Sequence, residues 1–290
     1  MKNLAYSARH YGLALCLLLC LLLCLSACKT QEKNTQIKLY AIDCGTLDVA
    51  DMDAFSDDGK LKGQQAQLVN PCFLIRHPRG DLLWDLGYQQ DLAETKEGVL
   101  FFQHFRKKMH SKLSAQLSKI GMRPEDVEFI SVSHHHDDHV GNANLFAGAH
   151  WIAQEAEYAT MFSKESQAEA STFDMYAKLA TAKTSLFKTE FDVFGDNSVV
   201  IRWMPGHTEG STVLRVQLDH AGTILLTGDL YTHADARVRN SIPSFDANKQ
   251  AGLRSRAQFE QWAKEEKARV VIQHEKTHFD ALPRYPDFLN

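Results

Sequence analysis

The chain has 290 residues, of which 44% are hydrophobic, 23% charged and 10% aromatic, with 16 Gly and 7 Pro. This composition excludes a collagen-like or low-complexity chain, argues against general disorder and leaves ample apolar material for a core. The formal net charge is −4, and since residues 1–28 hold two basic residues and no acid, the remainder holds 30 basic and 36 acidic residues without a basic cluster, so we expect no nucleic-acid partner.

The N-terminal residues have the pattern of an export signal. Lys2 and Arg9 precede an uninterrupted apolar run at residues 13–25. A membrane-spanning helix needs ~20 residues, so this run is too short to cross a bilayer. Its length and its basic flank are typical of the apolar region of a secretory signal peptide.

The apolar run ends in Leu25-Ser26-Ala27-Cys28, which resembles the bacterial lipobox, whose cysteine is lipidated and becomes the first residue of the mature chain. An ordinary signal peptide with a coincidental cysteine is the alternative. Lys29 stands where an inner-membrane retention Asp would be found, which favours an outer-membrane anchor facing the periplasm. We therefore expect residues 1–28 to be a lipoprotein signal peptide, residues 29–36 a polar tether, and the lipid on Cys28 the contact with the membrane.

Two cysteines, Cys44 and Cys72, remain in the body of the chain. In an oxidising periplasm they could form a disulfide. Both stand in apolar, strand-like sequence, so two buried free thiols agree equally well with the pattern. The sequence does not decide between these two states.

Residues 37–290 are expected to form one domain, because short runs rich in Val, Ile, Leu and Phe alternate with helical patterns throughout. Strands are predicted at 37–43, 72–77, 81–85, 127–132, 150–153, 199–204, 212–217, 223–226 and 270–273. Helices are predicted at 111–120, 154–162, 172–183 and 256–267, with a loop at 163–171. The early strands are linked by a hairpin turn at 77–80 and the later ones are separated by helices, which favours mixed sheets covered by helices in a layered α/β domain.

One short segment after a predicted strand concentrates metal-binding side chains. In an extended chain residues two apart point to the same side, so His134 and His136 share one side. Asp138 and His139 come next, where the chain is expected to turn into a helix beginning near Val140. Imidazole and carboxylate ligands suit Zn²⁺, and also Fe or Mn.

Three further metal-binding residue types, His207, Asp229 and His274, each stand just past a predicted strand. Loops gather at strand ends, and binding sites are built there. A solvated histidine-rich loop is the alternative for residues 134–139 alone, but the three similarly placed residues favour a built site. His135 and Asp137 are interpreted as supporting residues.

These residues resemble the motifs of the metallo-β-lactamase superfamily. The matching blocks are His134-x-His136-x-Asp138-His139, Pro205-Gly206-His207-Thr208, Thr227-Gly228-Asp229 and His274. Their order and spacing agree with the family, so the resemblance covers residues 37–290 and implies a four-layer αββα sandwich with the metals at one edge. The ligands it implies are His134, His136 and His207 for a first metal, Asp138, His139 and His274 for a second, and Asp229 as a bridge, with two Zn²⁺ as the expected cofactors.

Within that superfamily the chain is most similar to the N-acyl-homoserine lactonase-like group, in segments 39–45, 72–78, 83–87 and 141–143. True β-lactamases typically lack the bridging Asp, so Asp229 disfavours a β-lactam substrate. Lactonases usually carry an active-site Tyr three positions after that Asp, and Tyr231 lies two positions after it, which leaves an ordinary packing role as the alternative. The catalytic residues that the resemblance implies are Asp138, Asp229 and Tyr231.

The implied reaction is the opening of a lactone ring by metal-bound hydroxide, with an N-acyl-homoserine lactone or a similar small ester as substrate. A thioesterase of the glyoxalase II kind uses much the same ligands, and a non-catalytic zinc-binding lipoprotein is the alternative of another class. The apolar stretch at residues 99–105 is expected either to cover the site and grip an acyl chain or to form a helix face packed on the core.

Overall fold

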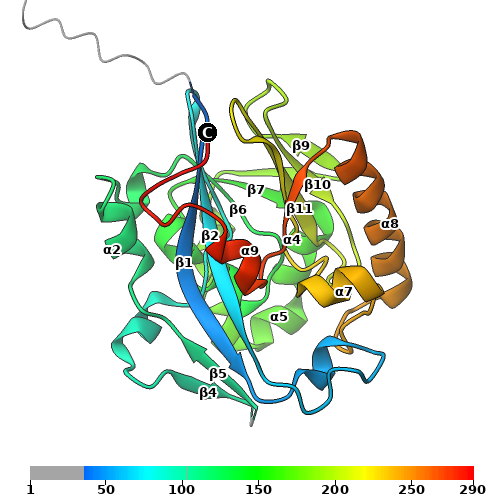
Figure 1. Ribbon diagram of the computed structural model, residues 1–290. Coiled ribbons are helices and arrows are strands. Elements are labelled where there is room, and N and C mark those ends of the chain that lie inside the picture. Colours follow the sequence, from blue (N-terminus) through cyan, green and yellow to red (C-terminus); the bar gives the residue numbers. More distant parts are fainter. Residues whose placement is uncertain (1–35, 103) are drawn as a thin grey trace, which may run out of the picture. The chain divides into compact units, whose positions relative to one another are not determined.

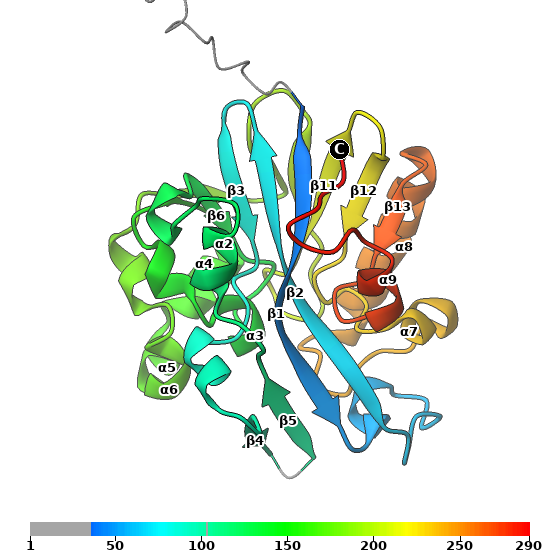
Figure 2. The ribbon, with the colours of Figure 1, turned by 60° about the vertical axis from the view of Figure 1, so that its left-hand side comes forward.

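Two β-sheets stacked face to face form the centre of the molecule (Figures 1 and 2). The computed structural model describes residues 36–102 and 104–290, so the expected signal peptide, Cys28 and the tether up to residue 35 lie outside the described residues. The eight-stranded sheet has the order β4-β5-β1-β2-β3-β6-β7-β8, with β1 Lys38–Val49, β2 Ala66–His77, β3 Gly80–Trp84, β4 Val99–Phe101, β5 Phe105–Lys108, β6 Phe129–Ser131, β7 His150–Gln154 and β8 Thr184–Phe187. The five-stranded sheet has the order β13-β12-β11-β10-β9, with β9 Glu190–Asp192, β10 Val199–Trp203, β11 Thr212–Leu218, β12 Gly222–Leu226 and β13 Arg269–Val271.

Successive side chains of a strand point to opposite faces of the sheet, and this alternation explains the layers. Leu39 and Ala41 of β1 belong to the core between the two sheets, whereas Tyr40 and Ile42 belong to the core on the outer face of the larger sheet. Helices cover both outer faces, as Figure 2 shows. The helices are α2 Leu113–Ser118, α3 Asp137–Val140, α4 Glu155–Met161, α5 Lys164–Ala168, α6 Ala170–Phe173, α7 Ala234–Arg239, α8 Lys249–Glu265 and α9 Lys276–Asp280.

The hydrophobic core on the outer face of each sheet shows which helices cover that sheet. Side chains of α2 and α4 pack in the outer core of the larger sheet. Phe259 and Trp262 of α8 pack against Val213 and Leu225 of the smaller sheet. The molecule is therefore the expected four-layer αββα sandwich, and the expected layered α/β class is confirmed.

The continuous helix predicted at residues 172–183 is wrong. The chain there forms α6 and then a short 3₁₀ turn at Ala177–Thr181. The side chain of Asn144 explains the break: its Nδ2 donates to the Asp174 carbonyl, and its Oδ1 accepts from the Lys178 N–H. A continuous α-helix would pair that carbonyl with that N–H, so the amide of Asn144 takes both of their hydrogen bonds.

Caps account for two other differences from the sequence prediction. The loop expected at 163–171 contains α5, whose first turn is capped by Ser163 Oγ accepting from the Ser166 N–H. Helix α8 begins seven residues before the expected 256, because Asn248 Oδ1 accepts from the Ala251 N–H at its start. Helix α3 begins at Asp137 instead of near Val140.

Several short elements had no detectable period in the sequence. Strands β4, β5, β8 and β9 and helices α7 and α9, each of three to six residues, were not predicted. The hairpin turn between β2 and β3 is confirmed. Within residues 36–102 and 104–290, none of the helices combines the length and the apolar character that a membrane span requires.

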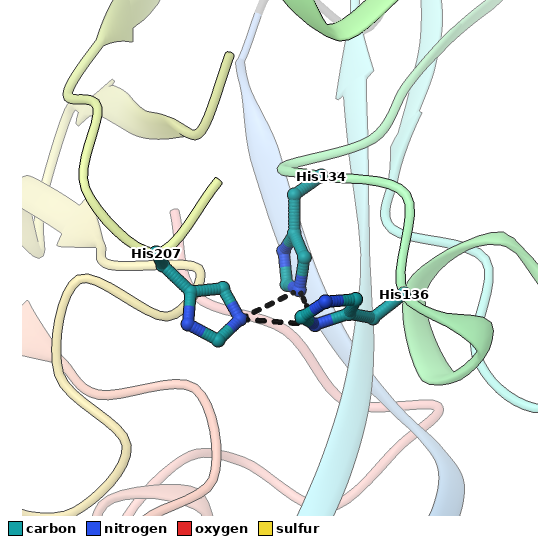
Figure 3. Close-up of side chains that lie close together, drawn as sticks. All are labelled: His134, His136 and His207. Atoms are coloured by element: carbon teal, nitrogen blue, oxygen red, sulfur yellow. Dashed lines mark hydrogen bonds between the residues drawn. The ribbon is translucent and has the colours of Figure 1, made fainter. Parts of the chain in front are cut away.

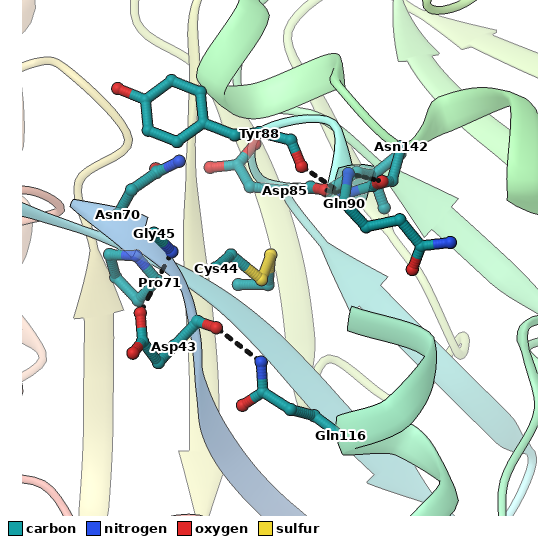
Figure 4. Close-up of a disulfide and its surroundings, with 12 residues drawn as sticks. Asp43, Cys44, Gly45, Asn70, Pro71, Asp85, Tyr88, Gln90, Gln116 and Asn142 are labelled. Atoms are coloured by element: carbon teal, nitrogen blue, oxygen red, sulfur yellow. Dashed lines mark hydrogen bonds between the residues drawn. A yellow bond between two sulfur atoms is a disulfide. The ribbon is translucent and has the colours of Figure 1, made fainter. Parts of the chain in front are cut away.

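Strands β1 and β2 are joined by a disulfide between Cys44 and Cys72 (Figure 4). The two Cα atoms lie 5.7 Å apart, beside a register shift in the pairing of the strands. Both cysteines are fully buried. The structure therefore has the disulfide rather than the free thiols that the sequence left as the alternative.

Candidate metal centre

Seven side chains singled out in the sequence meet at one edge of the sandwich. Four come from the loop after β6 and from α3, and the other three follow β10, β12 and β13. Strands β10 and β12 are both antiparallel to β11, and β13 is parallel to β12, so the carboxyl ends of all three strands share one edge. The seven residues are His134, His136, Asp138, His139, His207, Asp229 and His274.

Three imidazoles form one half of the cluster (Figure 3). His134 Nε2 lies 2.9 Å from His136 Nδ1. His207 Nε2 lies 3.1 Å from His134 Nε2 and 3.0 Å from His136 Nδ1. Two nitrogens bound to one tetrahedral zinc at ~2.0 Å are ~3.3 Å apart, so this triangle has nearly the size of one face of a zinc site.

Two carboxylates and two imidazoles form the other half. His139 Nε2 lies 3.6 Å from Asp138 Oδ1 and 3.5 Å from Asp229 Oδ1. His274 Nε2 lies 3.0 Å from Asp229 Oδ1 and 3.7 Å from Asp138 Oδ2. The other oxygen of Asp229 lies 3.6 Å from His207 Nε2, so this carboxylate faces both halves.

The charges of the two halves differ. Burial, and then the neighbouring imidazoles, hold the pKa of His134 well below its ordinary value, and burial lowers the pKa of His136 to about 3. Burial also acts against protonation of His139, but Asp138 and the other nearby carboxylates raise its pKa to about 10. Burial opposes the ionisation of Asp229, yet the surrounding imidazoles hold its pKa below the ordinary range. Burial opposes the protonation of His207 too, but its contact with Asp246 and the charge of Asp229 raise its pKa. His134 and His136 are therefore neutral imidazoles, and the second half pairs imidazolium with carboxylate.

Two buried polar atoms without a hydrogen bond indicate whether the cluster fits metal ions. His139 Nε2 and Asp229 Oδ1 are buried and form no hydrogen bond among the described residues, since His274 Nε2 hydrogen-bonds the other oxygen of Asp229. Buried polar atoms without a partner are costly and therefore rare. A cation between them would satisfy both atoms, and the donor set of imidazole and carboxylate suits divalent zinc, iron or manganese. The residues present therefore fit two metal ions, with Asp229 between them.

Two of the histidines contact an oxygen acceptor through the ring nitrogen that faces away from the cluster, and this contact orients the ring. His207 Nδ1 lies 2.8 Å from Asp246 Oδ1, and His274 Nδ1 lies 2.8 Å from the Val69 carbonyl oxygen. Such contacts fix the tautomer and the ring orientation that a metal ligand needs. The sequence offered no signal for Asp246, which lies 39 residues from its partner.

A third acceptor, Asp85, holds the loop after β6. Its Oδ2 lies 3.0 Å from His139 Nδ1, and its Oδ1 accepts from the Ser133 N–H at 2.6 Å. Both Asp85 and His139 are fully buried. The contact places His139 with its Nε2 toward the carboxylates of the cluster.

The buried carboxylate of Glu157 in α4 connects two of the ligand loops. It accepts from the N–H and the ring Nδ1 of His135 in the first loop. Its other oxygen accepts from Thr208 Oγ1 at 2.7 Å and from the Gly210 N–H at 3.1 Å in the loop after β10. His135 therefore has the supporting position expected of it.

A cavity of about 850 Å³ opens beside the cluster. Its lining includes His136, Asp138 and other members of the cluster, together with aromatic walls from several loops. The aromatic walls are Phe55, Tyr88, Phe101, Phe102, Phe105, Tyr176 and Phe245. The stretch 99–105 thus contributes to the cavity as strands β4 and β5, and its interpretation as a helix face is wrong. Asp137 lies beside this wall in an ion pair with Lys107.

The structure does not bring Tyr231 to the cluster. Its hydroxyl donates to Glu260 Oε1 at 2.9 Å, and its ring packs on Phe259 and under the guanidinium of Arg256. The residue is 1% exposed and belongs to the core beneath α8, outside the lining of the cavity. The side chain that lies three positions after Asp229 is Thr232, which does line the cavity.

The comparisons with known proteins agree with this geometry. The family model described as the metallo-beta-lactamase superfamily matches residues 67–256. The N-acyl homoserine lactonase AttM of Azorhizobium caulinodans is 26% identical over 264 residues, covering 88% of this chain and 99% of the relative. An N-acyl homoserine lactonase of Bacillus thuringiensis is 24% identical, covering 87% of this chain and 98% of the relative.

Solved structures show the same fold. An N-acyl homoserine lactone hydrolase with the product N-hexanoyl-L-homoserine bound at its catalytic metal centre superposes with a TM-score of 0.75 at 22% identity, covering 88% of this chain and 100% of that chain. AidC, a dizinc quorum-quenching lactonase, superposes with a TM-score of 0.62 at 16% identity, covering 83% of this chain and 88% of that chain.

Proposed function

This chain belongs to the metallo-beta-lactamase superfamily, and from that premise we propose that it is a dinuclear zinc hydrolase that opens the ester ring of N-acyl-homoserine lactones or similar lactones. The observation that carries the proposal is the seven-residue cluster beside a cavity lined in part by aromatic side chains. The relatives reported above are N-acyl homoserine lactonases that align over nearly their full length, which supports a lactonase-like activity on ester bonds.

The cluster would hold the metals through its imidazole and carboxylate atoms, with Asp229 shared between them. Bound metal ions would supply the Lewis acidity that activates water at neutral pH and polarises the ester carbonyl. The chain itself supplies orientation: Asp246 and Asp85 hold His207 and His139 in place. Asp229 is also placed to receive a proton and pass it to the departing alkoxide, because its carboxylate faces both halves of the cluster.

The cavity walls support a substrate with an apolar substituent. Phe101, Phe102 and Phe105 line the cavity, and so do Phe55 and Phe245, with Phe55 packed edge to face on both Phe105 and Phe245. An acyl chain among these rings would bury apolar surface, at roughly 0.8 kcal/mol for each CH₂ group. True β-lactamases typically lack the bridging Asp, and this chain has Asp229 at that position, so we do not propose β-lactams as substrates.

One panel tests the proposal. Purified zinc-loaded protein, a chelated sample and the His134→Ala and Asp229→Asn variants are assayed on N-acyl-homoserine lactones, simple γ-lactones, thioesters and β-lactams, with the metal content measured on the same samples. We expect lactone opening that chelation and both variants reduce by several orders of magnitude. His110→Ala, which changes an exposed histidine outside the cavity lining, is the matched control and should keep wild-type turnover.

The outcomes separate the candidates. Faster turnover of thioesters than of lactones would favour the thioesterase. Two bound metals with no turnover on any ester would favour the zinc-binding protein. Near-wild-type turnover in either variant would contradict the assigned ligands.

We also propose that the domain is carried by a lipid on Cys28 at the outer membrane, facing the periplasm. The lipobox at residues 25–28 supports this proposal, and so does the Cys44–Cys72 disulfide, because disulfides persist in oxidising compartments. Cells expressing the full chain and labelled with a fatty acid should label this protein. The Cys28→Ser variant should lose the label and leave the membrane fraction, and unchanged labelling would refute the anchor.

A further inference from the structure

The cavity beside the cluster is lined by a tyrosine whose hydroxyl forms no hydrogen bond with the other described residues of the site. Tyr88 lies in the loop after β3, is 4% exposed and lines the cavity together with Asp138, Asp229 and His274. Its backbone carbonyl accepts from Asn142 Nδ2, but its hydroxyl has no hydrogen-bond partner within the described ranges. Figure 4 shows its ring turned away from the disulfide, with the hydroxyl on the far side.

The loop that carries Tyr88 is held from several directions. Gly87 has a φ of +66°, and a Cβ atom there would lie 2.4 Å from Cys44 Cβ, so only glycine fits against the disulfide. The Gly87 carbonyl accepts from the Gly141 N–H at 2.8 Å, and Asn142 Nδ2 donates to the carbonyls on both sides of Gly87. Asp85 also has a positive φ of 56°. A non-glycine residue at positive φ persists only where its surroundings fix it, so the ring of Tyr88 is presented to the cavity from a rigid loop.

The surroundings favour a donor role for this hydroxyl. A phenol is protonated at neutral pH, and burial raises the pKa of Tyr88 further above its ordinary value, so the hydroxyl can donate. Lys107 Nζ lies 5.4 Å from the ring centroid and adds a cation beside it. The other candidate phenol, Tyr231, already donates its proton to Glu260 in the core.

We infer that Tyr88 is a catalytic residue that donates a hydrogen bond to the carbonyl oxygen of the scissile ester. The inference rests on the proposed function. Negative charge develops on that oxygen as the carbonyl carbon is attacked, so a fixed donor stabilises the transition state more than the bound substrate. No proton is transferred from Tyr88 in this step.

The test compares three Tyr→Phe variants of the zinc-loaded protein, with N-hexanoyl-homoserine lactone as substrate. Tyr88→Phe should lower kcat roughly 10- to 100-fold with a smaller change in KM, because one hydrogen bond to a charged oxygen is lost. Its metal content should equal that of wild type. It should also bind the ring-opened product N-hexanoyl-homoserine several-fold more weakly in a calorimetric titration. Tyr285→Phe, whose hydroxyl bonds the Gln116 carbonyl away from the cavity, is the matched control and should match wild type in each measurement.

Three results would overturn the inference. One is wild-type kcat in Tyr88→Phe, and another is a loss of kcat in Tyr231→Phe alone. A third is loss of metal together with kcat in Tyr88→Phe, which would indicate a structural role. If wild-type protein opens no lactone, the proposed function fails instead, and the product titration still decides the role of Tyr88, because equal binding by wild type and Tyr88→Phe refutes it.

Discussion

At the scale of single residues, the oxygen acceptors that contact the Nδ1 atoms of the histidines affect the metal affinity of the cluster. Asp246 is a buried side chain whose contact with the site runs through His207 Nδ1. We expect Asp246→Ala to weaken metal affinity roughly 10- to 100-fold, because the ring loses its orienting acceptor. Competition with a chromogenic chelator measures this. Asp196→Ala removes the same kind of Asp–His contact from His77, outside the cavity lining, and should leave metal affinity unchanged.

Glu157 is the second residue whose effect is indirect. It is 2% exposed and accepts four hydrogen bonds from two ligand loops. Glu157→Ala removes the acceptor of these four donors, two of which are buried, so we expect the free energy of unfolding to fall by about 2–4 kcal/mol. Urea denaturation measures the loss. Glu155→Ala changes an exposed residue on the same helix, and an equal loss there would refute the role of the buried carboxylate.

At the scale of elements, the hairpin of β4 and β5 forms one wall of the cavity although much of it is exposed. Phe102 is 72% exposed yet lines the cavity. We expect Phe102→Ala to raise KM for long-chain lactones roughly 3- to 10-fold, with little effect on short-chain lactones or on folding, because only contact with the acyl chain is lost. A KM series over chain length measures this effect.

A control for that series exists on α7. Val238 is 84% exposed and lies outside the cavity lining, so Val238→Ala should leave the whole series unchanged. Equal KM changes for short and long chains in Phe102→Ala would show that the hairpin does not contact the acyl chain.

At the scale of the whole molecule, the cluster connects the two sheets. Four of its residues follow β6 of the larger sheet, and three follow strands of the smaller one. Metal bound there stabilises only the folded state, by RT ln(1 + [metal]/Kd), which is about 4 kcal/mol at a thousandfold excess over Kd. We expect a chelator to lower Tm by several degrees and zinc to restore it. A Tm that does not respond to either treatment would contradict a site shared between the sheets.

Acid should release the metals. The neighbouring carboxylates raise the pKa of His139 to about 10, so below that pH the free imidazole is protonated. Metal binding must then displace the proton, and apparent affinity should fall as pH falls, on the order of tenfold for each pH unit. Chelator competition between pH 8 and pH 6 measures this slope. A flat profile would show that His139 binds metal without releasing a proton.

Much of the fold and of the cluster followed from local patterns. The alternation of Tyr40 and Ile42 with Leu39 and Ala41 places them on opposite faces of β1, because side chains of a strand alternate. In the same way, spacing alone put His134 and His136 on one side of the chain. Short elements such as β4 and β9 escaped detection, since three residues show no period.

The composition, the strand pattern and the spacing of the histidines and aspartates were enough to indicate a layered α/β domain with metal-binding side chains at strand ends, because these features depend on neighbours in the chain. The hydrolase with two metals was implied by the resemblance to the metallo-β-lactamase superfamily. Contacts between distant segments decided the rest. The amide of Asn144 breaks the helix expected at 172–183, Asp246 reaches His207 across 39 residues, and Gly87, next to Tyr88, packs directly against Cys44 of the disulfide. The resemblance implied Tyr231 because it stands close to Asp229 along the chain, whereas the direction in which its side chain points is set by packing in the core beneath α8.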